Sequence, residues 1–308
     1  MVYKLNKIIS IGDLHGDYKV FIKILKMCNL INNNLDWTGK DTYVVQTGDI
    51  LDGRRPNIQL NPTFEKESGE VEIMQLIVKL DRQAKKFNGR VIALIGNHEL
   101  YPYYFNGDKQ FISDYVKKTD IKKYNDEYKM SRHQFLQRGG PAWSKLKRPL
   151  ILKLGEFIFV HGSLTDKLIK YGLNSKTGKV DINRINTETN LWLNKRGKIP
   201  KFLIETDEQN PVFSRTYSNK KEFSSRKCNK IEKQIDKFEG VNYVVMGHST
   251  FDSINSTCNK SLIRTDVELS RAFGGNLNRK IQVLEIKQRL NSTPVIKIVS
   301  PHGKIELR

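Results

Sequence analysis

Five short apolar runs recur along the chain, and each leads into a polar side chain that can bind a metal ion. The runs are Ile8–Ile11, Tyr43–Val45, Val91–Ile95, Phe157–Val160 and Tyr243–Met246. Their apolar residues are continuous rather than alternating with polar ones, which is typical of strands buried on both faces. We therefore expect buried strands whose ends carry polar groups, in most cases just after a glycine.

Helical spacing lies between these runs. Two sets of apolar residues are spaced i, i+3, i+4, i+7, as on one face of a helix: Tyr18, Phe21, Ile22 and Leu25, then Ile73, Leu76, Ile77 and Leu80. Strands that alternate with helices predict an α/β fold in which helices flank the sheets. Ligands in such folds bind outside the carboxyl ends of the strands, which is where all five polar groups fall.

The rest of the chain predicts one domain over residues 1–308 with three insertions. Residues 53–68 are polar and contain prolines, and we expect a loop at the rim of the site. Residues 101–148 are rich in lysine and aromatic residues with helical patches, and we expect a helical cap over the pocket. Residues 195–237 form a basic, weakly periodic insertion. The tail predicts two more strands, Ile281–Ile286 and Val295–Val299.

Composition excludes several classes of protein. Hydrophobic residues make up 38% of the 308 positions, which is enough for a sizeable core. No apolar run approaches the ~18–20 residues of a membrane span, and the N-terminus lacks the features of a signal peptide. The cysteines Cys28, Cys228 and Cys258 are odd in number and have no CxxC spacing, so we expect neither a disulfide nor a thiolate zinc site. Because free cysteines are typical of reducing compartments, we expect a cytoplasmic location. Cys28 lies on an apolar helical face, and we expect it in the core.

The chain is strongly basic, with 53 Lys and Arg against 33 Asp and Glu, a formal net charge of +20. Such an excess attracts polyanions and phosphorylated partners. A lysine-rich solvated surface has the same composition without any such partner. Contact with a polyanion or nucleic acid through the basic surface therefore stays open.

Histidines are concentrated at the predicted strand ends. Four of the six histidines, His15, His98, His161 and His248, stand there beside Asp, Asn or Gly. A single histidine is usually a surface or core residue, but four at strand ends point to a shared site. In GDLHG, one residue separates Asp13 from His15, so both can turn toward one ion.

Carboxylate and amide groups complete the candidate metal site. The Asp49 carboxylate has two oxygens and can bridge two ions, and Asn97 offers a neutral oxygen. The full candidate set is Asp13, His15, Asp49, Asn97, His161 and His248. This mixed set of oxygen and nitrogen donors suits Mn²⁺ first, with Fe or Zn²⁺ as alternatives. Paired ions in such sites lie roughly 3.5–4 Å apart and clamp a phosphoryl group during displacement.

Five motifs carry a family resemblance. GDLHG, GDILDGRR, GNHE, VHG and MGHS, in that order, resemble the signature blocks of the calcineurin-like metallophosphoesterases, and GNHE is similar to the phosphoprotein phosphatase branch. FLQRGGPAWSKL and TDVELSRAFGG look like the Shewanella-like, bacterial-type phosphatases. The resemblance implies a layered metallophosphoesterase fold, a sandwich of mixed β-sheets flanked by helices.

The resemblance also implies roles for the candidate residues. Asp13, His15 and Asp49 hold the first metal, and Asp49, Asn97, His161 and His248 hold the second. His98 is the general acid that protonates the leaving group, and Asp52 orients it. A hydroxide that bridges the two metals attacks phosphorus directly, without a phosphoenzyme.

Phosphate-binding arginines are implied in two places. Arg215, in PVFSRTY, fits the later position of the family pattern. At the earlier position the usual DRG reads DGRRP, so that either Arg54 or Arg55 is the candidate. The planar guanidinium group suits both because it binds phosphate oxygens in pairs.

These residues favour a phosphomonoesterase, and first of all a protein phosphatase acting on Ser, Thr or Tyr residues. Its partners would be a phosphorylated protein or a small phosphoester. A phosphodiesterase or nuclease, or a dinucleoside polyphosphate hydrolase, would use the same metal site. A scaffold without metals is the third alternative, and the intact set of ligands argues against it.

Overall fold

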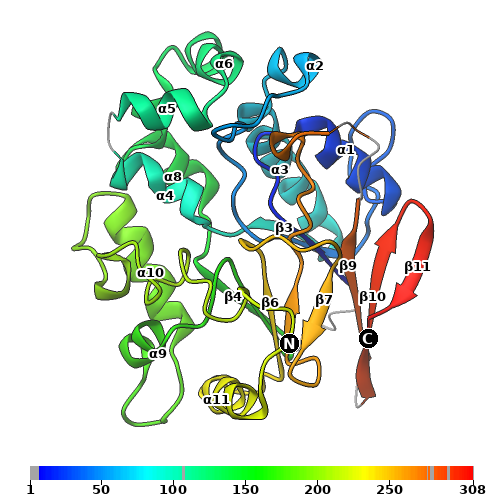
Figure 1. Ribbon diagram of the computed structural model, residues 1–308, viewed down its shortest axis with the longest axis vertical. Coiled ribbons are helices and arrows are strands. Elements are labelled where there is room, and N and C mark those ends of the chain that lie inside the picture. Colours follow the sequence, from blue (N-terminus) through cyan, green and yellow to red (C-terminus); the bar gives the residue numbers. More distant parts are fainter. Residues whose placement is uncertain (1–6, 106–107, 276, 278–280, 290–291, 308) are drawn as a thin grey trace.

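Two β-sheets pack against each other with helices on their outer sides in the computed structural model (Figure 1). The structure describes residues 7–105, 108–275, 277, 281–289 and 292–307. The expected α/β sandwich of mixed sheets is confirmed.

The first sheet has six strands in the order β11-β10-β9-β1-β2-β3. Their bounds are β1 Ile8–Ile11, β2 Tyr43–Gln46, β3 Arg90–Ala93, β9 Val283–Arg289, β10 Ser292–Ser300 and β11 Gly303–Glu306. Strands β1, β2 and β3 are parallel, whereas β9, β10 and β11 extend the sheet in antiparallel pairs. The parallel strands therefore bring their carboxyl ends to one edge.

The second sheet has five strands in the order β4-β5-β6-β8-β7. Their bounds are β4 Ile151–Leu154, β5 Phe157–Val160, β6 Tyr243–Met246, β7 Asn255–Thr257 and β8 Leu262–Arg264. Strands β5, β6 and β8 are parallel, so this sheet also has three carboxyl ends at one edge.

Eleven α-helices and three 3₁₀ turns connect the strands in the described part of the chain. The helices are α1 Tyr18–Met27, α2 Pro62–Glu65, α3 Glu70–Ala84, α4 Asn97–Tyr104, α5 Lys109–Tyr115, α6 Lys118–Tyr128, α7 Arg132–Leu136, α8 Pro141–Leu146, α9 Asp166–Gly172, α10 Ile182–Leu193 and α11 Ser225–Ile235. The 3₁₀ turns are Lys85–Phe87, Lys201–Leu203 and Arg271–Phe273. Helices α1 and α3 lie beside the first sheet, and α4 to α8 gather at one end of the molecule (Figure 1).

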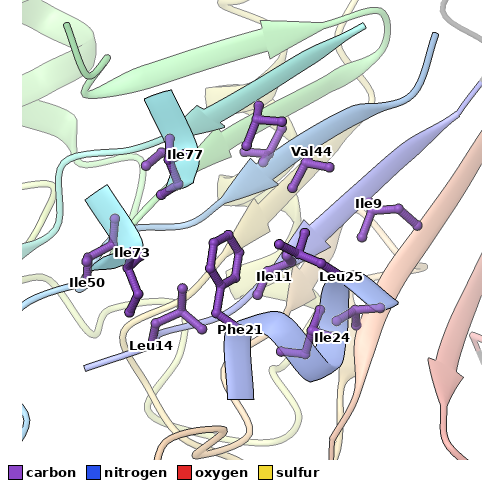
Figure 2. Close-up of a cluster of buried hydrophobic side chains, with 14 of the residues drawn as sticks. Ile9, Ile11, Leu14, Phe21, Ile24, Leu25, Val44, Ile50, Ile73 and Ile77 are labelled. Atoms are coloured by element: carbon purple, nitrogen blue, oxygen red, sulfur yellow. The ribbon is translucent and has the colours of Figure 1, made fainter. Parts of the chain in front are cut away.

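The main core lies between the two sheets and beneath α1 and α3. Figure 2 shows Phe21 and Leu25 of α1 among side chains of β1, β2 and α3. On β5, Phe157 and Phe159 belong to this core, whereas the alternate residues Ile158 and Val160 belong to a second core under α9, α10 and α11. Burial on both faces is why the β5 run is continuously apolar.

The predicted elements agree with the structure, with two additions. The five apolar runs form β1, β2, β3, β5 and β6, and the two helical patterns form α1 and α3. Residues 101–148 are largely helical. The predicted loop over residues 53–68 contains the short helix α2, and the tail adds the strand β11 to the two expected strands.

The expectation of no disulfide was wrong. Cys228 of α11 and Cys258 of the turn after β7 are joined, with their Cα atoms 5.1 Å apart, whereas Cys28 is free and buried as expected. An odd count does not prevent two of three cysteines from pairing, and the fold brings these two together across 30 residues. Because disulfides persist in oxidising compartments, the cysteines no longer support a reducing one.

Within the described residues, every helix is too short or too polar to pass through a lipid bilayer.

Candidate active site

The carboxyl ends of the two sets of parallel strands bring the six candidate ligands together. All six side chains are buried. His161 Nε2 lies 2.8 Å from Asn97 Oδ1 and 3.3 Å from Asp49 Oδ2, although these residues follow three different strands. Strand pairing within the first sheet and packing of the second sheet against it have thus joined the ends of β2, β3 and β5 in one cluster.

Asp49 occupies the centre of the cluster. Its Oδ2 lies 3.9 Å from His15 Nε2 and 3.8 Å from His98 Nε2, and His15 Nε2 lies 4.0 Å from Asp13 Oδ2. Two groups of side chains could each hold an ion: one is formed by His15, Asp49 and His98, and the other by Asp49, His161 and His248. A carboxylate shared by two such groups is suited to bridge two cations.

The second nitrogen of each ligand histidine is held by a backbone carbonyl. His15 Nδ1 lies 2.9 Å from Leu51 O, and His161 Nδ1 lies 2.8 Å from Thr47 O. His248 is turned the other way, because its Nε2 lies 3.0 Å from Phe213 O. Such contacts fix both the ring orientation and the tautomer, and leave the remaining nitrogen for a metal ion.

The backbone of the site is locally strained. His15, Asp49 and His248 have positive φ angles of 40°, 57° and 68°. Side chains rarely adopt this conformation, and it concentrates at functional sites, where the surrounding structure enforces it. Gly96 allows the closest approach, since a Cβ atom added there would lie 2.2 Å from Asp49 Oδ1.

Burial and crowding set the charge of the ligands. Burial raises the pKa of Asp13 well above its usual value, and the carboxylates of Asp266 and Asp49 add to this rise. Burial opposes ionisation of Asp49 too, but the His161 and His98 rings outweigh it and hold the Asp49 pKa well below its usual value. Divalent cations would relieve the repulsion among these carboxylates, so the residues present fit a pair of such ions.

Burial also lowers the pKa of two ligand histidines. The His15 pKa lies well below its usual value because of burial and of the charges of Arg55 and His98. The His248 pKa is lowered by burial, by His161 and by Arg215. Both rings are therefore neutral near neutral pH, which is the form that binds metals.

His98 lies beside the six predicted ligands and is close enough to His15 and Asp49 to form a group with them that could hold an ion. Its Nδ1 lies 2.8 Å from Asp52 Oδ2, and its backbone N–H donates to Asp49 Oδ1 over 2.9 Å. With Nδ1 tied to Asp52, Nε2 faces Asp49 and the space around it. This is the geometry of a proton donor oriented by a carboxylate.

The two neighbouring arginines have different surroundings. Arg54 Nη1 donates to Glu65 Oε1 over 2.6 Å at the protein surface. Arg55 instead lies over the Phe273 ring at 4.5 Å, and its Nη1 donates to Asp52 O over 2.9 Å. Burial lowers the pKa of Arg55 and the carboxylates of Asp49 and Asp52 oppose that shift, so Arg55 lies within the electric field of the site.

Arg215 borders the site at His248. Its Nη1 donates to His248 O and to Ser249 Oγ, each over 2.9 Å. The structure thus brings Arg55 and Arg215 to the site from distant segments, and directs Arg54 away from it.

Sequence reasoning missed a carboxylate at the same sheet edge. Asp266 follows the short strand β8 and is 1% exposed, and its Oδ2 has no hydrogen-bond partner. Burial raises its pKa to about 6, and Asp49 contributes to the rise. The signal in LIRTD was weak, because only Leu262 and Ile263 are apolar before the carboxylate and β8 has only three residues.

Glu99, the last residue of GNHE, was also missed. Its carboxylate accepts hydrogen bonds from the backbone N–H groups of Asp49, Ile50 and Gly96 over 2.7 to 2.9 Å. Arg148 lies 3.2 Å from it on the other side. Glu99 therefore ties the end of β2 to the end of β3, and so fixes the backbone of Asp49.

Two curated proteins are similar to this chain in sequence. Shewanella-like protein phosphatase 1 of Plasmodium berghei (strain Anka) is 30% identical over 314 residues, covering 98% of this chain and 78% of the relative. Shewanella-like protein phosphatase 2 of Arabidopsis thaliana is 27% identical over 328 residues, covering 92% of this chain and 76% of the relative. These relatives confirm the resemblance to the Shewanella-like phosphatases.

A solved structure has the same fold. The cold-active protein-tyrosine phosphatase of a psychrophilic Shewanella species superposes with a TM-score of 0.73 at 19% identity, covering 99% of this chain and 81% of that one. Residues 6–250 match the family described as calcineurin-like phosphoesterase. With the motifs in order and the site assembled, the chain belongs to the calcineurin-like phosphoesterase family.

Proposed function

We propose that this metallophosphoesterase is a protein phosphatase, and that it acts on phosphotyrosine in preference to phosphoserine and phosphothreonine. The observation that carries the proposal is the convergence of two metal-binding groups on Asp49 with the His98–Asp52 pair beside them. The six ligands would hold two divalent ions, for which Mn²⁺ is the first candidate, with Fe or Zn²⁺ as alternatives.

Different residues of the chain bind the phosphate and donate the proton in the proposed reaction. When bound, the two ions supply an acidified water as nucleophile and neutralise charge on the phosphate. Arg55 and Arg215, whose Nη1 atoms are held by Asp52 O and by His248 O, bind phosphate oxygens through their remaining guanidinium donors. His98 donates a proton from Nε2 to the leaving oxygen, and Asp52 holds the ring in the required tautomer.

Aromatic side chains surround the general acid and support the preference for tyrosine. The ring centroids of Tyr101 and Tyr115 lie 4.5 and 5.9 Å from that of His98. Phe111 stacks on Tyr115 at 4.8 Å, and Phe213 lies 5.7 Å from Tyr101. Because the leaving group must lie against His98, an aryl group would pack on these rings, whereas a serine side chain would leave them uncovered.

A panel of matched peptides tests the proposal. Peptides that differ only in carrying phosphotyrosine, phosphoserine or phosphothreonine are assayed with Mn²⁺ for released phosphate. We expect kcat/KM to be at least roughly tenfold higher for phosphotyrosine than for phosphoserine or phosphothreonine. A tenfold ratio corresponds to about 1.4 kcal/mol, which aromatic packing in the transition state can supply. Phe111→Ala should reduce this preference, and the distant, exposed Phe87→Ala should leave it unchanged.

Single-stranded oligonucleotides, assayed beside the peptides, test the nuclease alternative. A nuclease would cleave single-stranded oligonucleotides with a steep dependence on salt. Release of phosphate from none of the peptides would overturn the proposal. A cytoplasmic location stays a prediction, and the Cys228–Cys258 disulfide weighs against it.

A further inference from the structure

Both carboxylate oxygens of Asp52 are occupied, and only one of them by His98. Oδ2 lies 2.8 Å from His98 Nδ1, whereas Oδ1 accepts a hydrogen bond from Arg132 Nη2 over 2.7 Å. Arg132 is the first residue of α7, 80 positions along the chain from Asp52 and inside the segment 101–148. The helical segment beside the site thus reaches the group that orients the general acid.

Glu70, at the start of α3, fixes Arg132 in turn. Arg132 Nε donates to Glu70 Oε2 over 2.7 Å, and Arg132 Nη2 donates to Glu70 Oε1 over 2.9 Å. Glu70 Oε1 also accepts from the backbone N–H of Asp52 over 2.8 Å, and Tyr124 of α6 donates to Oε2 over 3.1 Å. Glu70, Asp52 and Arg132 are all buried, at 0%, 0% and 8% exposure.

This geometry restrains Asp52 in two ways. Its backbone has a positive φ of 67°, and the hydrogen bond to Glu70 holds it there. Its carboxylate plane is set by two partners on opposite oxygens, whereas a carboxylate held only by His98 could rotate and carry the imidazole with it. The planar fork of arginine can satisfy Glu70 and Asp52 together, which the single ammonium group of lysine cannot do in the same geometry.

We propose that Arg132 is a positioning residue for proton donation by His98. Through Asp52 it keeps the His98 ring aimed at the leaving oxygen, so that the segment 101–148 supplies part of the acid machinery as well as a cover for the site. The inference rests on the proposed function. A purely structural role, in which Arg132 only anchors α7, is the competing explanation.

The leaving group separates these explanations. Proton donation matters for a poor leaving group such as phenol and hardly matters for 2,4-dinitrophenol, which leaves as an anion. We therefore expect Arg132→Lys to lower kcat on phenyl phosphate by roughly ten- to a hundredfold, as small misplacements of catalytic groups do. On 2,4-dinitrophenyl phosphate kcat should change less than about threefold, with KM and bound metal unchanged.

Arg138→Lys is the matched control. Arg138 lies in the same segment and anchors it, donating to Trp192 O over 2.8 Å and lying over the Trp192 ring at 5.3 Å, without a contact to Asp52 among its described interactions. The Arg138→Lys variant should lose kcat by the same factor on phenyl phosphate and on 2,4-dinitrophenyl phosphate, or should keep the wild-type kcat on both. A substitution of only one partner of a buried ion pair can impair folding. We therefore also measure a double variant, Glu70→Gln with Arg132→Met, in which both charges are removed.

A double-mutant comparison completes the test. If Arg132 acts through His98, adding Arg132→Lys to His98→Asn should cost no more on phenyl phosphate than His98→Asn alone. The inference would be overturned if Arg132→Lys lowered kcat equally on both aryl phosphates, or if its loss added to that of His98→Asn in the variant that carries both changes. Neither result would affect the phosphatase proposal. A wild-type protein that hydrolyses neither ester would instead refute the proposed function.

Discussion

At the scale of single residues, identical side chains at adjacent positions have different surroundings. Arg54 is paired with Glu65 at the surface, whereas Arg55 lies over Phe273 and faces the carboxylates of the site. The sequence DGRRP could not distinguish these residues, since both follow Asp52 closely and have the same chemistry. Their contacts distinguish them.

Alanine substitution at each of the two arginines tests this difference. Arg55→Ala should raise KM for an aryl phosphate and lower kcat/KM by roughly a hundredfold or more, because a charge-assisted contact to phosphate is lost. Arg54→Ala is the control and should change kcat/KM by less than about threefold, since an exposed ion pair contributes little. Steady-state kinetics on both variants checks the prediction, and an equal loss at both positions would contradict it.

At the scale of elements, the site depends on short strands that are followed by a candidate ligand, which comes just after a glycine in every case but that of β5. The ends of β2 and β3 approach so closely that only a glycine fits at position 96. A side chain there would collide with the Asp49 carboxylate and with the Asp49 backbone nitrogen, 2.5 Å away. The turn after β3 is therefore part of the metal site.

Gly96→Ala should impair metal binding more than it impairs folding. The added Cβ must displace Asp49, which both metal-binding groups share, and we expect at least roughly a tenfold weaker affinity for Mn²⁺ by titration calorimetry. Gly178→Ala serves as the control: its φ is +66° but nothing lies within 4 Å of an added Cβ. That change should cost ~1 kcal/mol of folding free energy and leave metal affinity unaltered. Unchanged Mn²⁺ affinity in Gly96→Ala would contradict the prediction.

At the scale of the whole molecule, the site concentrates buried carboxylates where the two sheets meet. Burial, together with the neighbouring carboxylates, raises the pKa of Asp13 and of Asp266, the latter to about 6. In the metal-free protein these groups bind protons that the unfolded chain releases, so the stability that they contribute is lost as pH rises from about 4 through these raised pKa values. The lowered pKa values of His15 and His248 have the opposite effect on stability below the ordinary histidine value of 6.5. Metal ions need the ionised ligands, so their affinity rises over the same range.

The stabilisation by metal should therefore grow with pH. We expect the increase in Tm on adding Mn²⁺ to be larger at about pH 8 than at about pH 5, because the metal binds more tightly once its ligands have lost their protons. Differential scanning calorimetry with Mn²⁺ and with a chelator, in buffers across this range, checks the prediction. The prediction would be contradicted if Mn²⁺ raised Tm by the same amount at every pH, or raised it more at acidic pH.

The sequence by itself determined the local features of the protein. Continuous apolar runs specify strands buried on both faces, and the polar residue after each run specifies what stands at the strand end. For this reason β1, β2, β3, β5 and β6 could be predicted, and Asp13, Asp49 and His161 among the ligands could be named before their distances were known. These signals lie within a few neighbouring residues.

Only the tertiary structure decided which distant groups meet. It placed Arg55 near the site and Arg54 against Glu65, paired Cys228 with Cys258, brought Asp266 to the site and placed Arg132 and Glu70 behind Asp52. No local pattern encodes such contacts, since they depend on strand order and on how the helices pack across tens to hundreds of residues. The ligands follow from the sequence near each strand end, whereas the groups that orient them follow from the packing of the whole chain.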